Sequence, residues 1–206
     1  MESYSTIAEK ASGEFVEKKS RFIGTICPVS TETEAVESIN AFRGQYWDAT
    51  HNCYAYMLRE GNLMRYSDDG EPKGTAGMPI LEVVRREALS DILVVVTRYF
   101  GGTLLGAGGL VRAYARGAKL AVDAAERVEM CECVCFSLAT PYPMYERVLK
   151  LIEDYPVHIK DTVFSDMVTL QIRMREDGFD RFSGEITELS SARVSPQVIS
   201  REFAAI

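Results

Sequence analysis

Apolar and polar residues alternate with the period of a β-strand in several segments of the first half of the chain. Residues 14–27 alternate around a polar kink and predict a first strand or hairpin. Residues 51–58 and 63–66 alternate on either side of a glycine-containing turn, which predicts a second hairpin. The run at 91–100 is nearly continuously apolar, with three consecutive valines, and is typical of a strand buried on both faces.

Three other segments have helical spacing. Thr31 and Glu34 match a capping box and predict a helix over about 31–43. Pro79 suits the first turn of a helix that runs to about residue 88. A long helix follows the glycine-rich segment 101–109, and its apolar stripe is predicted to contain Val111, Tyr114, Ala118, Val122 and Ala125.

The second half of the chain has a different order of elements. Its pattern predicts strand, helix, strand, strand, helix and strand at 131–139, 143–154, 157–164, 167–174, 178–190 and 193–203. This β-α-β-β-α-β order is that of a ferredoxin-like split unit. We therefore predict an α+β protein with two domains, 1–129 and 130–206.

The composition of the 206 residues, 47% hydrophobic and 26% charged, is that of a folded globular protein. No apolar run approaches the roughly 20 residues needed to cross a bilayer, and the N-terminus lacks the pattern of a signal peptide. We therefore expect a cytoplasmic protein without a membrane partner. In a reducing cytosol its five cysteines would remain thiols. Cys131, Cys133 and Cys135 alternate on one strand face and are interpreted as buried small side chains rather than as zinc ligands.

Charge is distributed unevenly along the chain. The net charge of −7 argues against a protein that coats nucleic acid non-specifically, and we expect no DNA partner. Between residues 72 and 119, however, seven basic residues face three acidic ones, a local net charge of +4. This basic sector consists of Lys73, Arg85, Arg86, Arg98, Arg112, Arg116 and Lys119. Arg112, Arg116 and Lys119 share a helix face and could meet successive phosphates of RNA, with Tyr99 and Phe100 nearby for stacking. The alternative is a solvated helix face that binds nothing, with Phe100 buried.

The loop 101–109 lies between a buried strand and a helix, where backbone N–H groups and the helix dipole could hold a phosphate. Ala107 stands where the Walker pattern requires Lys, and Val111 stands where a dinucleotide pattern requires Gly or Ala. The favoured interpretation is that the glycines allow positive φ and close backbone packing. The candidate phosphate-binding glycines are Gly101, Gly102, Gly106 and Gly108.

A second loop carries acidic residues. Asp68, Asp69 and Glu71 could bind a hard cation or act as acid and base, but their spacing matches no calcium loop. Ordinary turn chemistry, with Thr75 capping the next helix, is the favoured interpretation. His51 is either a catalytic group or a hydrogen-bonded, partly buried side chain. His158 lies in an apolar run and is interpreted as structural. No metal, cofactor or catalytic residue is assigned.

Four blocks carry a resemblance to a known family. They are SRFIG at 20–24, HNCYAY at 51–56, DDGEPKGTAG at 68–77 and VVVTRYFGGTLLGAGGLVRAY at 94–114. Together, and in this order, they resemble the IMPACT family in its bacterial two-domain YigZ type. The resemblance implies a first domain of the ribosomal protein S5 domain 2-like fold, with a four-stranded sheet and helices on one side. It implies a ferredoxin-like second domain similar to the last domain of elongation factor G.

The resemblance also suggests a function. Eukaryotic members of the family bind a translational regulator, whereas bacterial members have no settled activity. The first hypothesis is a translation-linked binding or regulatory protein that contacts RNA, the ribosome or a translation factor through the basic sector. The alternative is a small-molecule or nucleotide-binding enzyme, with Arg98 and Lys73 facing an anion between the loops 101–109 and 68–77. Its pocket would include His51, Asp69, Glu71 and Thr75. A protein-partner module that uses the second domain's sheet face is a third possibility.

Overall fold

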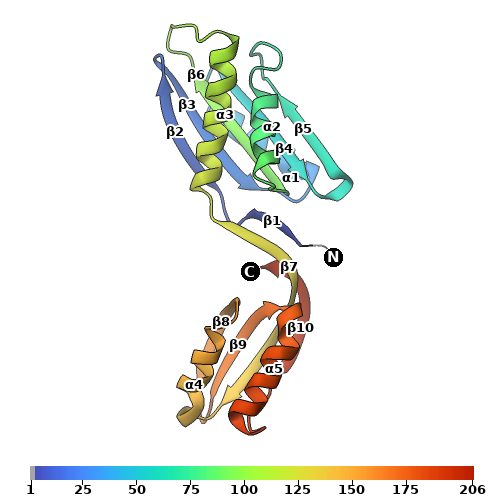
Figure 1. Cartoon of the computed structure of the whole chain (residues 1–206). Helices are drawn as coiled ribbons and strands as arrows, with labels where there is room; N and C mark the ends of the chain where they lie inside the picture. Colours follow the sequence, from blue (N-terminus) through green and yellow to red (C-terminus); the bar gives the residue numbers. More distant parts are fainter. Residues whose placement is uncertain (1–2) are drawn as a thin grey trace. The chain divides into compact units, whose positions relative to one another are not determined.

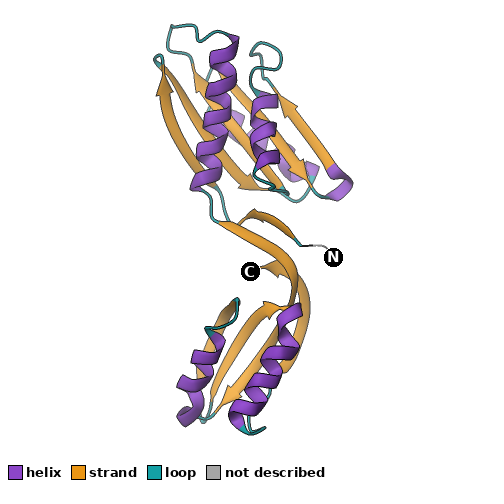
Figure 2. Cartoon of the chain, viewed as in Figure 1, coloured by secondary structure: helices purple, strands orange, loops and turns teal. Residues whose placement is uncertain are grey.

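The structure is a computed structural model that describes residues 3–206. It divides into two compact units, one formed by Tyr4–Val128 and the other containing Glu129–Ile206. Each unit combines an antiparallel sheet with α-helices (Figures 1 and 2). The predicted α+β class with two domains is therefore confirmed. No helix among residues 3–206 is long and apolar enough to cross a membrane.

The first unit is built on a five-stranded sheet with the order β2-β3-β6-β4-β5. Both predicted hairpins are present, one formed by β2 with β3 and the other by β4 with β5. Lys18 and Lys19 form the turn of the first hairpin at φ values of 45° and 68°, as a tight hairpin turn requires. The five strands of this sheet are β2 (Ala11–Glu17), β3 (Ser20–Pro28), β4 (His51–Leu58), β5 (Leu63–Ser67) and β6 (Ile92–Tyr99), and β1 (Tyr4–Ile7) precedes them without joining the sheet.

The helices of this unit are α1 (Glu32–Gln45), α2 (Gly77–Arg86) and α3 (Ala107–Ala124), with a short 3-10 helix η1 (Glu60–Asn62). The predicted N-cap of α1 is confirmed, because the Thr31 hydroxyl accepts a hydrogen bond from the backbone N–H of Glu34. Pro79 lies in the first turn of α2, as predicted.

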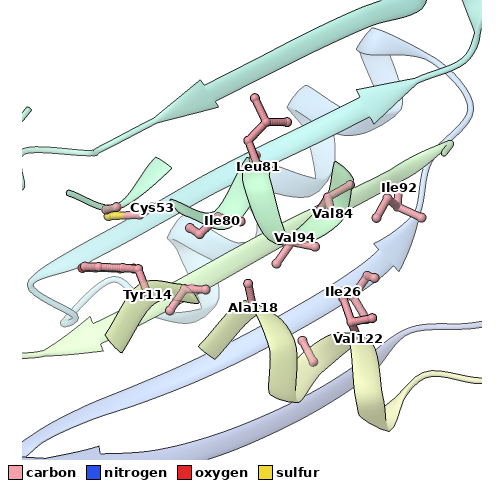
Figure 3. Close-up of a cluster of buried hydrophobic side chains, with 14 of the residues drawn as sticks. Ile26, Cys53, Ile80, Leu81, Val84, Ile92, Val94, Tyr114, Ala118 and Val122 are labelled. Carbon is pink, nitrogen blue, oxygen red and sulfur yellow. The ribbon is translucent and has the colours of Figure 1, made fainter. Parts of the chain in front are cut away.

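Helices cover both faces of the first sheet. The central strand β6 is buried on both sides, as its apolar run predicts. Val94 (Figure 3) packs into the core that holds α2 and α3, and so does Val96. Leu93 and Val95 pack instead with the apolar residues of α1. The expectation of four strands with helices on one side is therefore wrong. The apolar face of α1 must be buried, and it packs against the second face of β6.

The buried stripe of α3 differs from the predicted one at two positions. Val111 is 38% exposed and does not belong to the stripe, whereas Ala125 follows the helix end but still packs against the same core. The stripe begins instead one residue earlier and contains Leu110, Ala113, Tyr114, Gly117, Ala118, Ala121 and Val122. Tyr114 is completely buried and contacts the edge of Phe22 at a centroid distance of 5.4 Å. The helix thus approaches the sheet closely along its small residues.

The second unit has the predicted β-α-β-β-α-β order. Its elements are β7 (Arg127–Thr140), α4 (Tyr142–Ile152), β8 (Val157–Phe164), β9 (Val168–Arg175), α5 (Glu176–Ser190) and β10 (Gln197–Ala205). The strands run antiparallel in the order β10-β7-β9-β8, and the apolar core holds α4 and α5. Cys131, Cys133 and Cys135 are buried thiols, as predicted. His158 is exposed.

Candidate functional site

The loops of the first unit that carry the candidate residues meet at one end of its sheet. The start of β3 pairs with the end of β6, and the start of β4 pairs with the same end of β6. We call this edge, with the β2–β3 turn and the loops 68–76 and 100–106, the loop end (Figure 1). It contains a cavity of about 370 Å³, called the loop cavity below, whose walls include residues of both predicted loops. Its lining includes His51, Glu71, Arg98, Phe100, Leu104 and Leu105.

A buried ion pair closes the floor of the loop cavity. Arg98 and Glu71 are 5% and 8% exposed, and the Nη1 atom of Arg98 donates to Oε1 of Glu71 at 2.5 Å. The hydroxyl of Tyr114 donates to the same oxygen at 2.7 Å, and the other guanidinium end donates to Ser20. The Nε of Arg98 has no hydrogen-bond partner within the described chain. The positive charge of Arg98 is therefore neutralised by the carboxylate of Glu71.

His51 lies beside this pair at the start of β4. Its Nδ1 is 2.8 Å from the main-chain oxygen of Asp69, and its Nε2 is 3.8 Å from Oε1 of Glu71. Because a carbonyl oxygen only accepts hydrogen bonds, Nδ1 is the donor. The other ring nitrogen, Nε2, lies on the side of Glu71. His51 is the partly buried, hydrogen-bonded side chain of the second interpretation.

The acidic loop acts as a structural brace. One carboxylate oxygen of Asp68 accepts from the backbone N–H groups of Ala76 and Gly77 at the start of α2, and the other accepts from Gly74. Asp69 accepts from the backbone N–H of Asn52 and from Arg43. The prediction that Thr75 caps α2 is wrong. The Thr75 hydroxyl donates to the Pro72 carbonyl instead. The backbone N–H groups at the start of α2 bind the Asp68 carboxylate. Residues 3–206 contain no group of three side chains that could hold a metal ion.

The Asp68 brace gives the first testable prediction. Burial raises the pKa of the Asp68 carboxyl, but three backbone hydrogen bonds outweigh burial and hold it below the ordinary value. The charged form therefore stabilises the fold above the unfolded pKa of about 4, and this contribution is lost as pH falls through the lower folded pKa. Asp68→Asn should lower the free energy of unfolding by about 1–2 kcal/mol at pH 7. In urea unfolding, the difference from the parent chain should shrink below pH 4. A difference that stays constant with pH would show that charge is not the cause.

A basic groove adjoins the loop cavity. It has a volume of about 240 Å³, and Leu105 lines both spaces. Lys18 reaches it from the β2–β3 turn, and Arg112 and Arg116 reach it from α3. All three are exposed, and none forms an ion pair within residues 3–206. Glu17 also lines the groove.

The other basic candidates lie apart from the groove. Lys119 binds Asp123 and Glu87, and these hydrogen bonds raise the pKa of its ammonium group. Lys73 is exposed on the loop 68–76 and is not part of the cavity lining. The predicted basic face of α3 is therefore reduced to Arg112 and Arg116, with Lys18 added by the hairpin turn.

The glycines of the loop 101–109 have identifiable backbone roles. A Cβ atom on Gly101 would lie 2.0 Å from the carbonyl carbon of Lys19, so the loop packs directly on the hairpin turn. Gly102 and Gly106 have positive φ, and Gly108 lies exposed in the first turn of α3. These observations agree with the packing interpretation.

Two apolar residues at the loop end are unusually open. Phe100 and Leu104 line the cavity although 45% and 82% of their surface is exposed. Phe100 is therefore not the buried residue that the solvated-face alternative assumed. Sequence reasoning missed Leu104 and Leu105, for which the only signal is an apolar pair set between glycines. It also took Tyr114 for a core residue without a polar role.

The loop end lies within the part of the chain that has recognised relatives. A protein-family model described as "Impact N-terminal domain" matches residues 18–122, and one described as "Domain of unknown function (DUF1949)" matches residues 138–193. The "IMPACT family member YvyE" of Bacillus subtilis (strain 168) is 38% identical over 194 residues, which cover 94% of this chain and 89% of that protein. The chain belongs to the IMPACT family.

Other relatives show how far the likeness extends. The "IMPACT family member YigZ" of Escherichia coli (strain K12) is 31% identical over 90% of this chain and 91% of its own length. The "Protein IMPACT homolog" of Dictyostelium discoideum is 39% identical over 44% of this chain and 27% of its own length. A solved structure described as "Crystal structure of an hypothetical protein" covers 98% of this chain and all of its own, with a TM-score of 0.62 and 28% identity. The relatives of Bacillus subtilis and Escherichia coli therefore match this chain over nearly its whole length.

Proposed function

We propose that this IMPACT family chain is a translation-linked binding protein that holds single-stranded RNA along the basic groove of its first unit. The observation that supports this proposal is the convergence of Lys18, Arg112 and Arg116 from two separate elements on one groove. Phosphate contacts supply most of the affinity of a protein for a nucleic acid backbone, and they come mainly from such unpaired basic side chains. A protein with this role would act in the cytoplasm.

The surroundings of the groove support the same ligand. Phe100 and Leu104 are open beside it, and exposed aromatic side chains are the usual platforms on which unstacked bases lie. Because the overall net charge is −7, the three basic side chains of the groove attract phosphate locally and are not part of a uniformly basic surface. The link to translation comes from the family resemblance, which implies that eukaryotic members bind a translational regulator.

The double variant Arg112→Glu with Arg116→Glu tests the proposal. Three phosphate contacts predict a slope of about −2 when the logarithm of the association constant is plotted against the logarithm of salt concentration. The variant should bind a labelled single-stranded RNA at least about tenfold more weakly and with a slope near zero. Fluorescence anisotropy between about 50 and 200 mM salt measures both quantities.

Arg85→Glu with Arg86→Glu is the matched control. It makes the same change in charge at the far end of α2, outside the groove. This control should keep the affinity of the parent chain to within about threefold, since distant exposed charges are largely screened. Equal losses in both double variants, or an affinity that does not depend on salt, would contradict the proposal.

A further inference from the structure

The basic groove is a small space with a concentrated charge. Its volume of about 240 Å³ lies below the range of roughly 300–1,000 Å³ that is usual for sites of whole small molecules. Three basic side chains and one acidic side chain line it and give it a net charge of +2; they are Lys18, Arg112, Arg116 and Glu17. A single small group with two negative charges would therefore match the groove.

Arg116 is held in place by the protein itself. Its guanidinium carbon lies 4.3 Å from the centre of the Phe15 ring, and Phe15 in turn stacks on Phe22 at a centroid distance of 5.1 Å. A guanidinium that lies over an aromatic ring keeps its N–H edge free, and this planar fork matches two oxygens of one phosphate. Within residues 3–206 no acceptor binds these donors. Arg116 is therefore positioned to bind a phosphate at two of its oxygens.

One end of the groove is closed. Lys18 belongs to the β2–β3 turn on one side of the groove, and Leu105 belongs to the loop before α3 on the other side. A Cβ atom on Gly101 would lie 2.0 Å from the carbonyl oxygen of Lys19, so this turn and the loop 100–106 are in direct contact. The contact joins the two sides of the groove at the loop end. A continuous strand needs two open ends to run through a groove, whereas the end of a strand needs only one.

The two kinds of phosphate in an RNA strand differ in charge. An internal phosphodiester carries one negative charge, whereas a phosphomonoester has a second pKa of about 6 and carries about −1.5 to −2 at pH 7. The phosphomonoester also offers three strong acceptor oxygens. The net charge of +2 and the convergence of donors from two elements therefore favour a phosphomonoester, which in RNA occurs only at a strand end.

We propose that the basic groove binds a phosphomonoester at the end of the RNA strand, with Lys18, Arg112 and Arg116 gathered around its oxygens. The groove then selects strand ends that carry a phosphate over ends that carry a hydroxyl group. The adjoining nucleoside lies towards Leu105, which lines both the groove and the loop cavity. This inference rests on the RNA binding proposed above, and adds to it the chemical class of strand end that is bound.

Three heptauridylates test this selection, one with a 5′-phosphate, one with a 3′-phosphate and one with hydroxyl groups at both ends. The full chain should bind one of the phosphorylated strands about tenfold more tightly than the hydroxyl strand at one fixed salt concentration, because a hydrogen bond to a charged group contributes at least about that factor. The strand that binds more tightly identifies the end. Inorganic phosphate in excess over the RNA should not displace it, and displacement would overturn the assignment to an RNA end.

Lys18→Asn should remove most of the preference, and asparagine readily adopts the positive φ of 45° found at this turn position. Lys73→Asn is the matched control, since it makes the same change in charge at an exposed residue outside the groove lining. It should keep the preference. Arg116→Lys retains the charge but lacks the planar fork, so it should also lower the preference.

Equal binding of the three strands to the parent chain, with a normal salt dependence, would overturn the strand-end site and leave the groove in place. An equal loss of preference in Lys18→Asn and Lys73→Asn would likewise overturn it. Absence of salt-dependent binding to any of the strands would overturn the groove and the strand-end site together.

Discussion

Replacing Glu71 by alanine should destabilise the first unit by about 3–5 kcal/mol, the usual cost of removing one partner of a buried ion pair. The change would leave the Arg98 guanidinium, only 5% exposed, without its carboxylate. It would also remove the acceptor of the Tyr114 hydroxyl, and burial already raises the pKa of that phenol far above its ordinary value. A buried donor without a partner loses its hydration and gains nothing in return.

Urea unfolding followed by far-ultraviolet circular dichroism measures this loss. Glu82→Ala is the control, because it breaks the pair with Arg85 at a site where both side chains are largely exposed. That pair should contribute no more than about 1 kcal/mol. Combining Glu71→Leu with Arg98→Met should recover most of the loss, since two apolar side chains leave no charge buried. Equal effects of Glu71→Ala and Glu82→Ala would show that the buried pair is not the main contributor.

The Glu71 network also shows where sequence reasoning ends. The sequence singled out Glu71 as an acid of a loop, Arg98 as a group facing an anion and Tyr114 as a core residue. Their contacts span 27 residues between Glu71 and Arg98 and 43 residues between Glu71 and Tyr114. Periodicity tells which side of an element a residue faces, but not which distant residue it meets.

Local signals, in contrast, predicted local structure well. The capping box at Thr31, the alternation of both hairpins and the order of elements after residue 131 all depend on neighbours within a few residues. The position of α1 on the second face of the sheet could not be predicted in this way, because it depends on packing between distant elements. The groove likewise needs the β2–β3 turn to lie beside α3, which brings Lys18 to Arg112.

The approach of α3 to the sheet gives the second large prediction. Gly24 of β3 is buried, and a Cβ atom there would lie 1.9 Å from the carbonyl oxygen of Gly117 and 2.7 Å from its carbon. Both are backbone atoms, so no side-chain rotation can relieve the overlap. Gly24→Ala should therefore force α3 away from β3 and lower the free energy of unfolding by about 3 kcal/mol, the upper part of the range for overpacked cores.

Gly44→Ala is the opposite case and the matched control. Gly44 lies in α1 with no atom within 4 Å of a Cβ position, so alanine should stabilise the helix by about 0.5–1 kcal/mol. Chemical unfolding should show changes in the free energy of unfolding that have opposite signs in the two variants. If Gly24→Ala lowered this free energy by no more than an ordinary surface substitution does, the close packing of α3 on β3 would be contradicted. Because α3 carries Arg112 and Arg116, Gly24→Ala should also weaken the RNA binding proposed above, although no charge changes. The spacing between a strand and a helix therefore sets where the basic groove lies.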